Sequence, residues 1–273
     1  MKATGFAALC AVPFLLMASR ASGQPAKEKA EAPSREFSTE KVRRVRIEAE
    51  SGDVTVRGVA GAAAKATVTG SPSDCELVTE VQGADLVLTA KSVRKQFWRQ
   101  SNCKAGFSVD APKGLALDVS VGSGKIDVSM MGSEVEVRTG SGDIRLKDVA
   151  GGLKAHSGSG RIEGQASSSR VEARTGSGGV SLSRLQGSAD VRSGSGPVRL
   201  EWSEAPPQGE AQVRTGSGDI TLLFPAGAKL ATDVKTGSGR LQNEFGEAAE
   251  AGFRVSARAG SGDVSLRKAG VER

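Results

Sequence analysis

Apolar and polar residues alternate along most of the chain, in short runs on either side of a recurring Gly-Ser-Gly turn. Runs such as VEVRT at 135–139 and VEART at 171–175 have the period of two that is typical of strands with one buried face. From residue 115 onward eight copies follow one another, with steps of 18, 18, 18, 18, 22, 21 and 23 residues between their second glycines. The turn glycines are Gly122, Gly124, Gly140, Gly142, Gly158, Gly160, Gly176, Gly178, Gly194, Gly196, Gly216, Gly218, Gly237, Gly239, Gly260 and Gly262.

This repeat predicts an all-β fold, a single-domain parallel β-solenoid with coils of about 18 residues. Each strand has one apolar face that it cannot bury alone, so neighbouring copies must cover one another. An antiparallel β-propeller or a sandwich of GSG hairpins is the alternative. A degenerate copy at 50–56 places Gly52 72 residues before Gly124, or four times 18, which predicts eleven to twelve coils. The predicted core columns are Val119, Val137, Ala155, Ala173, Val191, Val213, Val234 and Ala257 before the turn, and Ile126, Ile144, Ile162, Val180, Val198, Ile220, Leu241 and Val264 after it.

The polar face of each unit is ordered in an acidic and a basic column. In a parallel stack the strands are about 4.8 Å apart, so the basic side chains would repel one another without acidic neighbours. One interpretation is a solvated face of mutually compensated charges, and the other is a strip that binds polyanions. The acidic column is Asp118, Glu136, Glu172, Asp190 and Asp233, and the basic column is Arg138, His156, Arg174, Arg192, Arg214, Lys235 and Arg258.

The turn motif has a structural explanation. Glycine tolerates positive φ and places no Cβ in the way of a sharp bend, and the Ser hydroxyl can bond local backbone groups. VGSGKI lacks the first Gly, the Ser or Thr and the helix of a phosphate loop. Asp follows the turn in only some copies, so a continuous calcium ladder is not available. We therefore expect no cofactor and no metal site.

Candidate catalytic residues are scarce. His156 is the only histidine of the sequence, and it occupies a position that other copies fill with Arg or Lys. The acidic residues mostly follow the repeat and do not form the isolated carboxylate pair that a glycan-cleaving enzyme needs. We therefore expect a protein that is not an enzyme and that has no catalytic residues.

Composition agrees with a thin repetitive fold. The 273 residues include 36 Gly, no Tyr and only 4% aromatic residues, so a thick core of helices on a sheet would be hard to fill. The net charge is +6, and removal of residues 1–23 would leave 35 basic (37 minus Lys2 and Arg20) and 31 acidic residues, or +4. This mild basicity does not point to nucleic acid.

The N-terminal segment resembles an export signal. Lys2 precedes an apolar stretch at 5–17 that is followed by small residues, so we expect a signal peptide at 1–23. The Ala-, Pro-, Lys- and Glu-rich residues 24–40 are expected to be a flexible linker, 41–269 the solenoid and 270–273 a tail. We expect no transmembrane segment after cleavage, and a periplasmic, cell-surface or extracellular location.

Two cysteines remain after cleavage. In an exported chain Cys75 and Cys103 predict a disulfide, and two free buried thiols are the alternative.

The segment from Lys91 to Lys104 (KSVRKQFWRQSNCK) departs from the repeat. Basic residues surround two aromatic ones, an arrangement that suits anionic lipids, glycans or membrane surfaces after export. A hairpin pinned by Cys103, with the aromatic pair capping the first coils, is the alternative. The candidate binding residues are Lys91, Arg94, Lys95, Phe97, Trp98, Arg99 and Lys104.

Three insertions lengthen the later repeats, and all of them follow the second strand of a unit. They would bring four aromatic residues to one edge of the stack. These side chains either form a contact surface or close the open side of the core. They are Trp202, Phe224, Phe245 and Phe253.

The TGSGDI/V-x-L units, the lead-in FSVDAPKGLALDVSVGSG at 107–124 and the signal peptide resemble the bacterial "putative adhesin" domains of unknown function. The resemblance covers about residues 42–269. It implies an exported right-handed β-solenoid of the cell envelope with no known catalytic residues. Nothing carries over to the KQFWRQSNCK segment.

Two hypotheses for the function follow. The first is a non-enzymatic envelope protein that serves as an adhesin or interaction scaffold for an unknown envelope or surface partner. The second is a module that binds or senses an envelope polyanion, an anionic glycan or lipid, through the basic columns and the Lys91–Lys104 segment.

Overall fold

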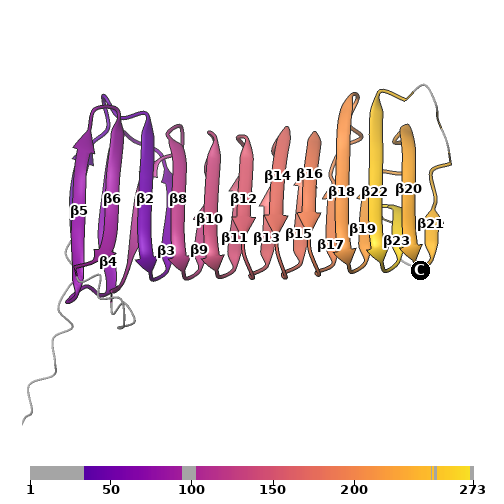
Figure 1. Cartoon of the computed structure of the whole chain (residues 1–273). Helices are drawn as coiled ribbons and strands as arrows, with labels where there is room; N and C mark the ends of the chain where they lie inside the picture. The colour runs from indigo at the N-terminus through magenta and orange to yellow at the C-terminus, as the bar shows by residue number, and fades with distance from the viewer. Residues whose placement is uncertain (1–33, 94–102, 247, 249–250, 271–273) are drawn as a thin grey trace, which may run out of the picture. The chain divides into compact units, whose positions relative to one another are not determined.

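The computed structural model describes residues 34–93, 103–246, 248 and 251–270. The predicted signal peptide and most of the predicted linker lie outside these residues. The described chain holds strands and turns, arranged as two sheets that face each other across a common core (Figure 1). Sheet A has twelve strands and sheet B has eleven.

Parallel pairing between successive repeats confirms the solenoid. Glu136 pairs with Lys154 in sheet B, and Ile144 pairs with Ile162 in sheet A, so residues 18 positions apart lie side by side. This register excludes the propeller and the sandwich of hairpins, whose neighbouring strands are antiparallel. Most coils contribute one strand to each sheet.

The strand bounds follow the spatial order of each sheet. In sheet A the order is β1 (Ser34–Ser38), β4 (Ala63–Ser71), β7 (Lys104–Pro112), β3 (Val54–Val59), β9 (Ile126–Ser129), β11 (Ile144–Val149), β13 (Ile162–Ala166), β15 (Val180–Leu185), β17 (Val198–Trp202), β19 (Ile220–Phe224), β23 (Val264–Lys268) and β21 (Leu241–Asn243). In sheet B it is β20 (Leu230–Ser238), β22 (Phe253–Ser261), β18 (Gly209–Ser217), β16 (Ser188–Ser193), β14 (Arg170–Thr175), β12 (Leu153–Ser157), β10 (Val135–Ser141), β8 (Ala116–Ser123), β2 (Arg44–Ser51), β6 (Asp85–Ser92) and β5 (Cys75–Gln82).

The predicted core columns line the space between the sheets. All sixteen side chains are buried except two, Val234, which is half-buried, and Leu241, which is 48% exposed. Both exceptions belong to the coil of β20 and β21, whose strands are the edge strands of the two sheets at this end of the described stack.

Close backbone stacking explains the turn glycines. A Cβ added to any of the sixteen would lie 1.7–2.6 Å from a carbonyl oxygen of the adjacent coil. Such a contact is impossible for a real side chain, so the column can hold glycine alone. Only Gly124, Gly218, Gly239 and Gly262 also have positive φ. The expectation that bending freedom selects these glycines is therefore wrong for most of the column, and close approach is the reason.

A column of hydroxyl groups ties successive turns together. The expected donor was the Ser between the two glycines, but the structure uses the Thr or Ser that precedes them. Its hydroxyl donates to the carbonyl of the second glycine in the adjacent coil, over 2.8–3.2 Å. The residues of this column are Thr139, Ser157, Thr175, Ser193, Thr215 and Thr236.

The N-terminal end of the stack differs from the predicted eleven to twelve coils. The Gly52 coil lies directly against the Gly124 coil, because β2 pairs with β8 and β3 with β9. Residues between these coils form β4 to β7 on the outer side of the Gly52 coil and add no further repeats. The spacing of four times 18 is therefore coincidental.

The first strand corrects the extent of the predicted linker. Residues 34–38 form β1, which pairs antiparallel with β4 at the edge of sheet A. Phe37 packs against the core, and the Arg35 guanidinium donates to Thr79 Oγ1 in β5 over 3.0 Å. Strand pairing, the Phe37 contact and the Arg35 hydrogen bond together fix this stretch to the end of the solenoid.

At the C-terminal end the coils are out of sequence order. Strand β22 lies between β18 and β20, and β23 lies between β19 and β21 (Figure 1). The last repeat, β22 and β23, therefore lies between the coil of β18 and β19 and the coil of β20 and β21, although β20 and β21 precede it in the sequence. Thr236 follows this order, since its hydroxyl bonds the Gly262 carbonyl.

The aromatic residues of the insertions close the core. Trp202, Phe224 and Phe253 are at most 1% exposed. The Trp202 and Phe224 rings stack with centroids 4.2 Å apart, and Trp202 Nε1 donates to the Gly187 carbonyl over 2.9 Å. Phe245 is half-buried and meets Phe224 edge-on. The contact-surface interpretation is therefore wrong for the three buried rings.

Gly160→Ala should destabilise the fold, because its Cβ would lie 1.7 Å from the Gly142 carbonyl oxygen. We expect thermal denaturation to show a Tm lower by about 5–10 °C, since overpacking costs about 1–3 kcal/mol. Gly114→Ala is the matched control, because nothing lies within 4 Å of that position. An equal Tm change in both variants would contradict the stacking argument.

The inserted last repeat can be tested with paired cysteines. Ser238 and Ser217 both pair with Ser261, so Ser238→Cys with Ser261→Cys should form a disulfide under mild oxidation. Ser217→Cys with Ser238→Cys should not, because two strand spacings separate them by roughly 9.6 Å. Non-reducing electrophoresis of proteolytic fragments shows which pair is cross-linked. A disulfide between positions 217 and 238, and none between 238 and 261, would mean that the coils stack in sequence order.

Candidate functional site

The outer face of sheet B carries the two predicted charged columns. Strand pairing places Arg138, His156 and Arg174 side by side, and the column continues through β16, β18, β22 and β20. The acidic column runs beside it, two residues earlier in each strand. These side chains are exposed or half-buried, so the face is accessible along its length.

Ion pairs compensate most of this face. Glu172 contacts His156 Nε2 at 3.3 Å and Arg174 at 2.9 Å, and Asp190 contacts Arg192 at 3.1 Å. Some carboxylates bridge two coils, as Asp233 does between Arg258 (2.9 Å) and Lys235 (3.0 Å). Arg138 pairs with Glu136, and Lys154, which interrupts the acidic column, pairs with Glu134 at 3.1 Å. The compensated-face interpretation describes these coils. His156 is one member of this network.

The compensation is incomplete on β18 and β22. Gln212 and Ser256 occupy acidic-column positions there, while Arg214 and Arg258 remain in the basic column. Within the described chain Arg214 has no ion pair, and neither does Arg254, which lies at the start of β22. A groove of about 420 Å³ crosses these strands and includes all five residues that define the gap in its lining: Gln212, Arg214, Arg254, Ser256 and Arg258.

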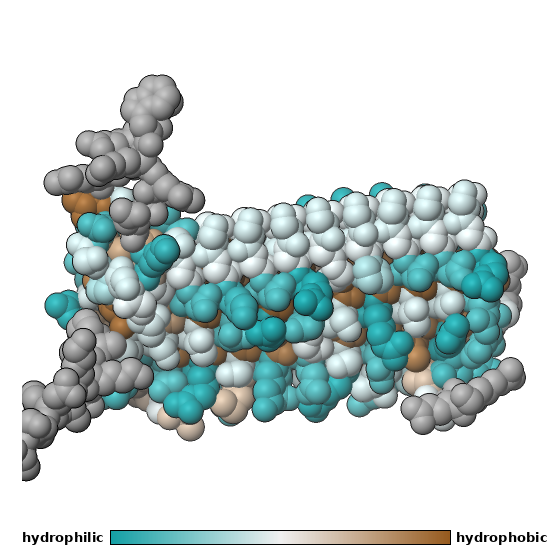
Figure 2. Space-filling model, turned by 90° about the horizontal axis from the view of Figure 1, so that it is seen from below, coloured by the Kyte–Doolittle hydropathy of each residue, from teal (hydrophilic) through white to brown (hydrophobic). Residues whose placement is uncertain are grey.

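Aspartates that follow some turns bind backbone groups of the adjacent coil. Asp143 Oδ1 accepts from the Arg161 N–H at 3.0 Å, and Asp263 Oδ1 accepts from the Arg240 N–H at 2.8 Å. The turns themselves form a pale band of Gly, Ser and Thr residues along the coils (Figure 2). The SGD motif thus has a structural role in stacking. Among the described residues there is no group of three or more His, Cys, Asp or Glu side chains placed to hold a metal ion.

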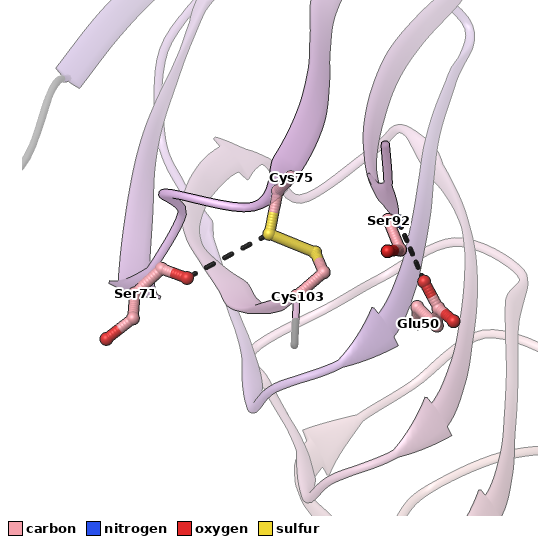
Figure 3. Close-up of a disulfide and its surroundings, with 5 residues drawn as sticks. All are labelled: Glu50, Ser71, Cys75, Ser92 and Cys103. Atoms are coloured by element: carbon pink, nitrogen blue, oxygen red, sulfur yellow. Dashed lines mark hydrogen bonds between the residues drawn. A yellow bond between two sulfur atoms is a disulfide. The ribbon is translucent and has the colours of Figure 1, made fainter. Parts of the chain in front are cut away.

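The predicted disulfide is present at the N-terminal end. Cys75 begins β5, Cys103 precedes β7, and their Cα atoms are 4.9 Å apart (Figure 3). Cys103 is fully buried. Nearby, the Ser92 N–H donates to Glu50 Oε2 over 2.8 Å, which fixes the end of β6 to the end of β2.

The candidate binding segment is described only at its ends. Lys91 is exposed on β6 and pairs with Glu48 at 2.7 Å, and Lys104 is exposed at the start of β7. The segment hypothesis stays a prediction, because its other candidate residues lie outside the described residues. They are Arg94, Lys95, Phe97, Trp98 and Arg99.

The family model of the Toastrack DUF4097 proteins matches residues 42–267. This range holds every coil of the stack. The chain belongs to the Toastrack DUF4097 family. No curated protein matches the sequence. In the part of the toastrack domain that the structure describes, no helix has the length and apolar character needed to cross a bilayer.

The solved structures that match this toastrack domain have low sequence identity to it. A "putative lipid binding protein" from Parabacteroides distasonis is 20% identical with a TM-score of 0.48, over 89% of this chain and 98% of that one. A "putative adhesin" from the same organism is 12% identical with a TM-score of 0.40, over 88% and 98%. A "putative cell adhesion protein" from Clostridium sporogenes is 12% identical with a TM-score of 0.32, over 87% and 100%. The fold assignment rests on strand pairing and the family match.

Two carboxylates at the C-terminal end of the toastrack domain have lowered pKa values. The pKa of Asp233 lies below its ordinary 3.8 because Arg258 and Lys235 donate hydrogen bonds to it. The pKa of Asp263 is lowered by the Arg240 backbone N–H and then by the Arg240 guanidinium. In both cases the folded state favours the charged carboxylate, so the stability of the last coils depends on pH.

The stability that Asp233 and Asp263 contribute should be fully present above about pH 4 and be lost as the pH falls through their lowered values. Asp233→Asn with Asp263→Asn should therefore lower the Tm at pH 7, and its difference from the wild type should shrink toward pH 2.5. Asp74→Asn, an exposed position in the N-terminal part, is the control. A difference that persists unchanged at low pH would contradict this assignment.

Proposed function

We propose that this toastrack domain is an exported, non-enzymatic protein of the cell envelope that acts as an interaction scaffold or adhesin. The single observation that carries the proposal is the outer face of sheet B, where charged side chains are held in register over successive coils. Such a face has little use in catalysis, which needs a few converging groups in a concave site. It suits repeated contacts with an extended partner.

Rigidity of the stack supports a scaffold role. The coils are joined by strand pairing on both sides, by the buried hydroxyl column and by the Asp to backbone bonds of the turns. A body of this kind holds side chains at fixed spacings along one axis. A partner with a matching repeat can bind without the entropy loss of ordering a loop.

The disulfide supports export. Cytosolic thiols are kept reduced, whereas disulfides persist in the periplasm and at cell surfaces. The Cys75–Cys103 bond joins the start of β5 in sheet B to the residue before β7 in sheet A, so it stabilises the part of the fold that lacks the repeat. Together with the apolar stretch at 5–17, this pairing argues for a location outside the cytoplasm.

Export can be tested with the full chain in bacterial cells. We expect the protein in periplasmic, membrane or surface fractions, with a mass reduced by loss of residues 1–23 and with no thiol available for alkylation before reduction. A variant lacking residues 2–23 should remain in the cytoplasm with reactive cysteines. Full-length protein found in the cytoplasm with free thiols would overturn the proposed location.

The scaffold role needs a separate readout. Purified chain without residues 1–23 should co-sediment with isolated bacterial envelopes in a saturable manner. Heat-denatured protein and an unrelated β-rich protein of similar charge serve as controls. Failure to saturate, or equal sedimentation of the controls, would contradict a specific interaction.

A further inference from the structure

The gap in the charge compensation of sheet B marks a site that the repeat itself does not create. Along β10 to β16 each basic-column residue has a carboxylate within 4.0 Å. On β18 and β22 the same positions are flanked by an amide and a hydroxyl, Gln212 and Ser256. Both of these side chains are half-buried and face the same outer surface.

The acidic groups nearest to the gap are already engaged. Glu210 is the strand partner of Arg254, but its carboxylate accepts a hydrogen bond from Gln212 Nε2 at 3.3 Å and makes no ion pair with Arg254. Asp233 is shared by Arg258 and Lys235. Two guanidinium groups, those of Arg214 and Arg254, therefore keep their donors for a ligand, as judged over the described chain. Both side chains are exposed.

The register fixes how these two groups are placed. Arg214 pairs with Arg258, and Arg254 stands four residues before Arg258 on the same strand. With a rise of about 3.3 Å per residue, their Cα atoms are roughly 14 Å apart on adjacent strands. Gln212 and Ser256 lie between them. A ligand that reaches both arginines must therefore be extended, and it must offer polar groups along its middle.

We propose that this groove binds an acidic polysaccharide, with sugar carboxylates on Arg214 and Arg254 and sugar hydroxyls on Gln212 and Ser256. Guanidinium groups bind carboxylates in a bidentate manner. Among the described residues that line the groove of about 420 Å³, Ala231 and Ala248 are the apolar ones, and the others are polar or charged. Amides and hydroxyls suit a hydroxyl-rich chain, whereas a bilayer surface is better matched by Lys clusters with large apolar side chains.

This inference rests on the proposed envelope location, since that is where such glycans occur. Its test is nevertheless a binding measurement on the purified chain, so a failure to bind leaves the export and envelope experiments untouched. In the same way, a cytoplasmic location would not change the measured affinity.

The probe is a fluorescent oligogalacturonide in low-salt buffer, with uncharged dextran oligomers, sulfated dextran and phosphatidylglycerol vesicles as parallel arms. We expect saturable binding of the oligogalacturonide that weakens as salt is raised. Arg214→Ala with Arg254→Ala should weaken it about ten-fold or more. Arg174→Ala with Arg192→Ala removes the same charge from arginines that are already paired, and should weaken it less than two-fold.

A second variant fills the gap without removing either arginine. Gln212→Glu with Ser256→Asp restores the acidic column, so it should abolish binding while leaving the Tm equal or higher. The proposal is overturned if both arginine pairs weaken binding equally, if the filled column still binds, or if no saturable binding occurs. Stronger binding to vesicles than to the oligogalacturonide would also overturn it, in favour of a membrane surface.

Discussion

The whole architecture depends on how closely the backbones of successive turns approach one another. At each of the sixteen turn glycines a carbonyl oxygen of the adjacent coil occupies the space that a side chain would need. This contact fixes the register, because a coil shifted by one residue would place Ser against that carbonyl. Register in turn keeps the apolar columns inside and the charged columns outside. The hydroxyl column then supplies a donor to the same crowded carbonyls in each coil that carries Thr or Ser before the turn.

The same register orders the charged residues of the outer face, and ion pairs balance most of their charges. Carboxylates such as Asp190 lie beside basic groups of their own and the neighbouring strand, so long rows of like charge are tolerated. Individual surface pairs contribute little to stability. These pairs affect selectivity instead, because paired side chains are not available to a ligand. In the described columns, unpaired charges remain only where the alternation of acidic and basic columns is interrupted. On β18 and β22 a Gln and a Ser make that break.

The repeat made the central coils predictable, while the ends were not. Spacing and period two were enough to place Val137 beside Ala155 and to identify the core columns. Gly52 was misplaced because 72 residues is a multiple of the period although the intervening chain forms other strands. The exchanged order of the last coils could not be predicted, because each copy has the same turn and the spacing does not say which copies are neighbours. The gap at Gln212 and Ser256 was visible in the acidic column. Its meaning required knowing that Lys154 pairs with Glu134, whereas Arg214 pairs with no carboxylate of the described residues.

The inserted last repeat has a consequence for the order in which the coils can assemble. During synthesis β20 and β21 leave the ribosome before β22 and β23, yet their only strand partners in the described fold are these later strands. The coil of β20 and β21 therefore cannot take its native place until β22 and β23 are present. Strands β22 and β23 then join the coil of β18 and β19 to the coil of β20 and β21, both of which come earlier in the sequence. Loss of residues 253–268 would consequently remove an inner coil of the stack, and the outer coil of β20 and β21 would lose its strand partners.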